Sequence, residues 1–143
     1  MLTPRKTASG YGAAAPPVVY ENQLIMVYDN EEESFVSAHD TASGKIRWKI
    51  PRNEKSTWAT PFVWKHSQGV EIVVCGRKEN RAYSTSGDLL WHFDGKMSVL
   101  TIPSPFAAEG LLYITSGYFQ VNKRPVYAIR PGARGDISLK EDE

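Results

Sequence analysis

The residues that could do chemistry are few, and they are scattered along the 143-residue chain. The acidic stretch 29–33, D-N-E-E-E, gathers oxygen ligands of the kind that bind Ca²⁺. It lacks the D-x-D-x-D-G spacing of an EF-hand loop, so a solvated hairpin tip is the preferred interpretation. His39, His66 and His92 share no common spacing. No catalytic, cofactor-binding or metal-ligating residues are therefore assigned from the sequence.

Composition and charge exclude several other classes of function. Cys75 is the single cysteine, so the chain can form neither an intrachain disulfide nor a cysteine-based zinc site. The net charge of +1 gives no reason to expect nucleic acid as a partner. No apolar run approaches the roughly 20 residues that a membrane-spanning helix needs. The N-terminus also lacks the apolar segment of a secretory signal peptide.

The elements that must position these residues are short strands. Apolar and polar residues alternate over four to six positions, and polar turns separate these runs. Pro17, Pro61 and Pro105 open three similar units and are spaced 44 residues apart. Four strands in each unit of this length are typical of a β-propeller blade. The sequence thus predicts an all-β fold, with a flexible lead-in at 1–13, units at about 14–55, 56–97 and 98–139, and a charged tail at 140–143.

One turn is repeated within these units. The segment 38–48 reads A-H-D-T-A-S-G-K-I-R-W, in which an aspartate can accept backbone N–H groups and a glycine can adopt positive φ. The segment 82–91, A-Y-S-T-S-G-D-L-L-W, repeats it one residue shorter, with Ser84 in the place of Asp40. We expect this second turn to be tighter and less well capped. The third unit ends instead in P-G-A-R-G-D-I-S-L, which stands where the last turn and strand should be.

The repeated turn resembles the AxDxxTGKxxW tryptophan-docking motif of the PQQ-like (quinoprotein alcohol dehydrogenase-like) β-propellers, a WD40-like architecture. In that family the tryptophan packs between neighbouring blades, and the resemblance carries this structural role to Ala38, Asp40, Gly44, Lys45, Trp48, Gly87 and Trp91. The implied fold is a partial propeller of about three four-stranded antiparallel blades. Because three blades do not close a ring, further blades are expected, either from a longer native chain or from self-association.

The resemblance implies a function only broadly. A non-catalytic scaffold or binding platform is expected, without a cofactor. The alternative is a piece of a PQQ-dependent oxidoreductase, which would use PQQ and calcium held by Glu and Asn, an Asp base and two adjacent cysteines. No such set can be matched in this chain. The family is mostly periplasmic or secreted.

A second alternative is binding of carbohydrate or another polymer, or of protein, at the axial mouth of the propeller. Trp58, Thr60, Thr101 and Ser104 occupy equivalent places just before Pro61 and Pro105. In a propeller these places lie near the axis, where Trp58 could stack on a sugar or a peptide. The competing interpretation is that the hydroxyl groups bond neighbouring strands and that Trp58 fills the channel.

Overall fold

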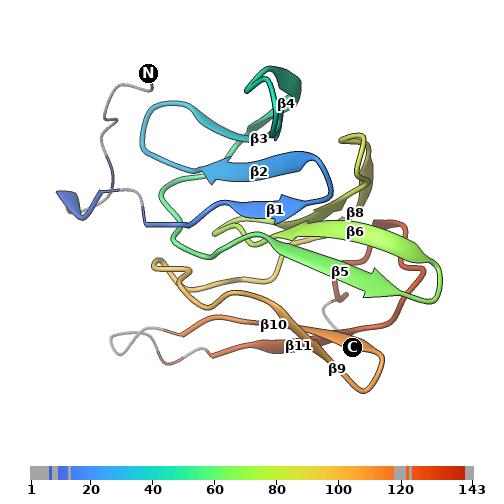
Figure 1. Ribbon diagram of the computed structural model, residues 1–143. Helices are drawn as coiled ribbons and strands as arrows, with labels where there is room; N and C mark the ends of the chain where they lie inside the picture. The colour runs from blue at the N-terminus through green and yellow to red at the C-terminus, as the bar shows by residue number, and fades with distance from the viewer. Residues whose placement is uncertain (1–6, 8–9, 13, 118–121, 123, 141–143) are drawn as a thin grey trace.

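The computed structural model describes residues 7, 10–12, 14–117, 122 and 124–140. These residues form twelve β-strands and no α-helix, in three sheets that lie face to face as layers (Figure 1). The all-β prediction is confirmed. The expected lead-in and charged tail lie largely outside the described residues. No helix within the described part of the chain is long and apolar enough to cross a membrane.

The first sheet is a four-stranded antiparallel meander. It consists of β1 (Val18–Tyr20), β2 (Gln23–Tyr28), β3 (Ser34–Asp40) and β4 (Ile46–Arg52). The acidic stretch forms the turn between β2 and β3. There, Asn30 accepts the backbone N–H groups of Glu32 and Glu33 through its Oδ1, at 2.8 and 2.9 Å. The side chain of Asn30 thus holds the hairpin closed in place of a backbone turn.

The second sheet repeats this meander and carries one additional strand. Its strands are β5 (Phe62–His66), β6 (Gly69–Val74), β7 (Asn80–Tyr83) and β8 (Leu89–Phe93), with β12 (Gly135–Asp136) beside β8. The third sheet has three strands: β9 (Phe106–Ala108), β10 (Leu111–Thr115) and β11 (Val126–Ile129). The first hairpin of each sheet has a two-residue connection, because Tyr20 pairs with Gln23, His66 with Gly69 and Ala108 with Leu111.

The place of the last strand differs from the prediction. Residues 131–139 were expected to complete the third unit, but β12 instead pairs in parallel with β8. The N–H of Ile137 donates to the carbonyl of His92 at 2.9 Å, and Ile137 packs against the core between the second and third sheets. The guanidinium of Arg134 reaches the buried carboxylate of Glu71 at 3.1 Å. These contacts hold the segment on the second sheet, so the third sheet has three described strands rather than the expected four.

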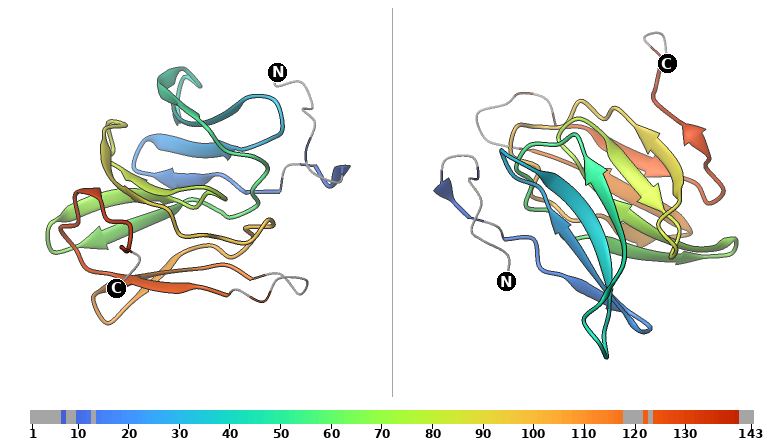
Figure 2. Two further views of the ribbon diagram at one scale, coloured as in Figure 1. Left: turned by 180° about the vertical axis from the view of Figure 1, so that it is seen from behind. Right: turned by 90° about the horizontal axis from the view of Figure 1, so that it is seen from above.

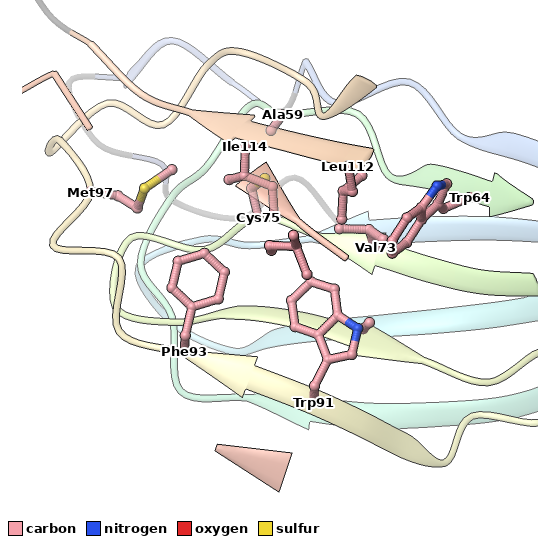
Figure 3. Close-up of a cluster of buried hydrophobic side chains, with 11 residues drawn as sticks. Ala59, Trp64, Val73, Cys75, Trp91, Phe93, Met97, Leu112 and Ile114 are labelled. Carbon is pink, nitrogen blue, oxygen red and sulfur yellow. The ribbon is translucent and has the colours of Figure 1, made fainter. Parts of the chain in front are cut away.

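Two apolar layers separate the three sheets. Between the first and second sheets lie Ile25, Val27, Val36, Ala38, Ile72, Val74 and Tyr83. Between the second and third lie, among others, Val73, Cys75, Trp91, Phe93, Leu112 and Ile114 (Figure 3). Consecutive residues of β6 point to opposite layers, as the two-residue period of a strand requires. The second sheet is therefore covered on both faces, as the view from behind also shows (Figure 2).

Candidate functional site

The repeated turn is built around Asp40. Its Oδ1 accepts the N–H groups of Ala42 and Ser43 at 3.1 and 2.8 Å. Its second oxygen accepts a hydrogen bond from Arg47 Nη2 at 2.6 Å. Gly44 has φ +70°, which glycine adopts without the steric cost that a Cβ would bring. The N–H of Asp40 donates to the carbonyl of Lys45 at 2.8 Å and closes the turn.

Trp48 joins this turn to the next sheet. Its indole Nε1 donates to the carbonyl of Thr85 at 3.0 Å. A Cβ added at Gly87 would lie 3.0 Å from two ring atoms of Trp48, and Gly87 has φ +95°. Glycine is therefore needed at position 87 both for the backbone conformation and for the close approach of the ring. Trp48, Gly87 and the turn 84–88 thus form a direct link between the first and second sheets.

The second copy of the turn uses a different cap. Ser84 Oγ accepts the N–H groups of Ser86 and Asp88 at 3.2 and 3.0 Å and donates to Asp88 Oδ2 at 2.9 Å. This hydroxyl accepts two backbone N–H groups, as the carboxylate of Asp40 does, but at slightly longer distances. The second turn also carries one carboxylate, but it belongs to Asp88 rather than to the residue equivalent to Asp40.

Trp91 has a different environment from Trp48. It is fully buried, at 0% exposure, while Trp48 is only half-buried. Its Nε1 donates to Glu71 Oε2 at 2.7 Å, which lies on β6 of its own sheet. The two tryptophans therefore share a position in the repeat but bond different partners.

The charge on Asp40 gives a pH-dependent prediction. The hydrogen bond from Arg47 holds the pKa of this carboxyl well below its ordinary value, and bonds from Ser43 act in the same direction. The stabilisation is therefore present above the unfolded-state pKa, about 4, and is lost as the pH falls below it. We expect Asp40→Asn to lower the urea midpoint at pH 7, and the difference from the parent protein to narrow below about pH 4.

Urea titrations at several pH values measure this effect. Glu109→Gln, in the exposed turn between β9 and β10, removes a carboxylate outside this turn and serves as the control. An Asp40→Asn difference that stayed constant from pH 7 to pH 3 would contradict the electrostatic explanation.

The four residues proposed for an axial mouth come together at one end of the sheets. The N–H of Trp58 donates to the carbonyl of Thr101 at 2.9 Å, and the N–H of Thr60 donates to Ser104 Oγ at 2.9 Å. Thr101 is fully buried, and its hydroxyl donates to the carbonyl of Ser98 at 3.2 Å. These groups connect the segments that lead into β5 and β9, so two of the expected binding hydroxyls are already bonded within the chain.

Trp58 itself contacts the segment that precedes the first strand. Its Nε1 donates to the carbonyl of Gly12 at 3.0 Å. The ring of Tyr11 lies edge-on to it, with centroids 6.5 Å apart. The indole N–H that could bind a ligand is thus already used, and the geometry favours a structural role for Trp58.

The acidic stretch also begins with a residue that is used internally. Asp29 forms a two-point ion pair with Arg52, at 2.9 and 3.1 Å, and both side chains have 0% exposure. Thr57 Oγ1 donates to Asp29 at 2.7 Å, and Arg52 Nη2 donates to the carbonyl of Cys75 at 3.2 Å. Burial alone would lower the pKa of Arg52, but the attraction of Asp29 outweighs it and raises that pKa. Among the described residues, no group of three His, Cys, Asp or Glu side chains could hold a metal ion.

Two buried carboxylates were not singled out from the sequence. Glu54 accepts the N–H groups of Lys78 and Glu79, both at 2.9 Å, and so caps the turn between β6 and β7. Glu71 accepts from Trp91 and Arg134. The signal for Glu71 is its place in V-E-I-V-V, because a charge in a strand buried on both faces requires a partner.

His66 and Glu71 form a buried pair that resembles half of an acid–base site. His66 Nε2 lies 3.4 Å from Glu71 Oε1. His66 Nδ1 accepts the N–H of Gln68 at 3.2 Å, so this nitrogen is engaged within the chain. Burial raises the pKa of the Cys75 thiol to about 12, which removes the cysteine as a nucleophile at neutral pH. His66, Glu71 and Cys75 are thus each engaged or buried within the fold.

The comparisons with known proteins add no identity. No protein-family model matches the chain, and no curated protein matches it significantly.

Proposed function

We propose that this chain is a non-catalytic scaffold, built as three consecutive blades of a PQQ-like β-propeller. The single observation that carries the proposal is the contact of Trp48 with Gly87 and the Thr85 carbonyl. This contact joins two successive repeats through the residues of the repeated turn. Its role is to hold neighbouring sheets together, which is what a scaffold of repeats requires.

The arrangement of the three sheets supports the same proposal. The second sheet is covered on both faces, whereas the outer face of the third sheet exposes Phe106 at 52% and Val126 at 69%. In a stacked repeat, such a face is buried against a further repeat or a partner. The expected partners are thus further blades, from a longer polypeptide or a second copy, or another protein.

The alternative is a quinoprotein-like oxidoreductase, which a direct assay separates from the scaffold. The buried carboxylates Asp29, Glu54 and Glu71 are each engaged by donors within the chain. A calcium ion that held a quinone through these carboxylates would have to displace those donors. We therefore expect equilibrium dialysis with PQQ and Ca²⁺ to show no saturable binding, and dye-linked alcohol oxidation to stay at the level of the protein-free control.

The parent protein and a Trp48→Ala variant are compared in the same assay. Saturable binding of the chromophore together with turnover by the parent protein would overturn the scaffold proposal.

A further inference from the structure

The register of the sheets contains a repeated row of cross-strand neighbours. Within the first two sheets this row runs across all four meander strands. In the first sheet it is Val18, Ile25, Ala38 and Trp48. In the second sheet it is Phe62, Val73, Ala82 and Trp91. Both rows therefore place a small alanine on the third strand and a tryptophan opposite it on the fourth.

The third sheet contains the same row but without its last member. Phe106 pairs with Tyr113, and Tyr113 pairs with Ala128. The aromatic rings of Phe106 and Tyr113 stack with their centroids 5.1 Å apart. No described strand lies on the other side of β11, because β12 has joined the second sheet. Ala128 is exposed, whereas Ala38 and Ala82 are fully buried. No described residue thus pairs with Ala128 on the side where Trp48 and Trp91 pair with the equivalent alanines, and an aromatic side chain could occupy this position.

A groove of about 470 Å³ lies beside this open edge. Its lining includes Phe93, Tyr127, Ile129, Ile137 and Leu139. Tyr127 and Ile129 flank Ala128 in the strand, so they point to the opposite face of the sheet. A strand paired with β11 would therefore place its aromatic residue beside Ala128 and the residues before and after it in the groove. Those flanking residues should be apolar.

Charge adds a further requirement at the end of the row. In both sheets the register shifts by one residue just after the alanine, which brings the residue three before each tryptophan to the end of the turn. There the N–H of Asp40 donates to the carbonyl of Lys45, and the N–H of Ser84 donates to the carbonyl of Asp88, each at 2.8 Å. Arg130 occupies the corresponding place after Ala128, and it is exposed. Among the described lining residues of the groove, Arg130 is the one that carries a charge. An added strand with the same register shift would therefore place an acidic residue, three before its aromatic, beside Arg130.

We propose that β11 accepts an extended strand from another polypeptide, by antiparallel strand addition. The strand carries an aromatic residue opposite Ala128, apolar residues on either side of it and an acidic residue three before it. Backbone pairing supplies affinity, and the aromatic and acidic positions supply specificity. This inference rests on the proposed function, since it names the partner class of the scaffold.

The protein's own second sheet provides a peptide with most of these features, although a histidine, rather than an apolar residue, follows its tryptophan. The sequence T-S-G-D-L-L-W-H-F-D, residues 85–94, has an acidic residue three before its tryptophan and a leucine directly before it. We expect a fluorescein-labelled form to bind the full chain saturably in a polarisation titration. Replacing the peptide's tryptophan by alanine should weaken binding about tenfold or more, because buried tryptophans dominate such contacts.

A charge exchange tests the place of binding. Arg130→Glu should weaken binding of the parent peptide several-fold, and changing the peptide's first aspartate to lysine should restore it. Lys65→Glu, at an exposed position of β5, changes the net charge equally and should leave binding unchanged. Near-UV circular dichroism verifies that the variants fold. Bound peptide should also slow amide hydrogen exchange at residues 126–130.

Several results would overturn the inference: no saturation at about 1 mM peptide, equal binding of the alanine peptide, or exchange protection confined to other strands. Self-association through β11 without peptide would identify a second copy as the occupant and would equally overturn it. These failures leave the scaffold proposal standing, whereas PQQ-dependent turnover would overturn the scaffold whatever the peptide does.

Discussion

Replacing Trp91 by alanine is expected to lower the free energy of unfolding by about 3–5 kcal/mol, the range for large aromatic truncations in a core. The side chain has 0% exposure and packs between the second and third sheets (Figure 3). Its loss leaves a cavity, and it also leaves Glu71 Oε2 buried without the indole donor. Urea denaturation followed by circular dichroism measures the change.

Two matched variants separate the causes of this loss. Trp91→Phe keeps most of the ring but removes the N–H, so it isolates the hydrogen bond to Glu71. Trp48→Ala truncates the same repeat position in a half-buried setting, and we expect about 1–2 kcal/mol there, in proportion to the smaller buried area. A Trp91→Ala loss below about 1 kcal/mol would show that the packing in this layer is not what stabilises the fold.

Breaking the buried ion pair should have an effect of similar size. Asp29→Leu leaves the guanidinium of Arg52 charged and without its carboxylate in a site from which water is excluded. Removing one partner of such a pair typically costs about 3–5 kcal/mol. The loss is expected in the urea-derived free energy of unfolding at pH 7, with the parent protein measured under the same conditions.

The double variant Asp29→Leu with Arg52→Met is the control for this result. Replacing both charges by apolar groups removes the unpaired charge, so the double variant should recover much of the stability that the single variant loses. Equal destabilisation of the two variants would mean that side-chain packing, rather than the unpaired charge, accounts for the loss. Lys49→Met, which removes an exposed ion pair with Glu33, should change stability by less than about 1 kcal/mol.

What could be predicted from the sequence depended on local patterns that repeat. The strands of the meanders follow from alternating apolar residues and turn chemistry, and the turn at Asp40 follows from its own side chains. The family resemblance predicts that Trp48 packs between neighbouring repeats, but its close approach to Gly87 comes from the folded structure. The cap formed by Ser84 was not anticipated. A hydroxyl and a carboxylate can both accept the backbone N–H groups of a turn, even where the turns differ in length.

The remaining features depend on partners distant in the sequence. Asp29 is one of several acidic residues in its stretch, and only the folded chain brings Arg52 and Thr57 to it. The same holds for Glu71, whose donors Trp91 and Arg134 come from two other segments. The segment G-D of β12 carries no strand propensity, so its pairing with β8 is decided by Ile137 and Arg134 at either side. The backbone hydrogen bond from Trp58 to Thr101 and the contact of Trp58 with Gly12 had no local signal.

The pairing of β12 with β8 has a consequence for how the protein is made. Each meander pairs strands that are neighbours in the sequence, so on the ribosome each sheet can form as its own segment emerges. The parallel contact between Gly135 and Trp91 instead waits for the whole third sheet to be synthesised. Until then, the outer edge of β8 is open to other chains. The slowest and most aggregation-prone interval of biosynthesis should therefore be the one between the emergence of Phe93 and that of Ile137.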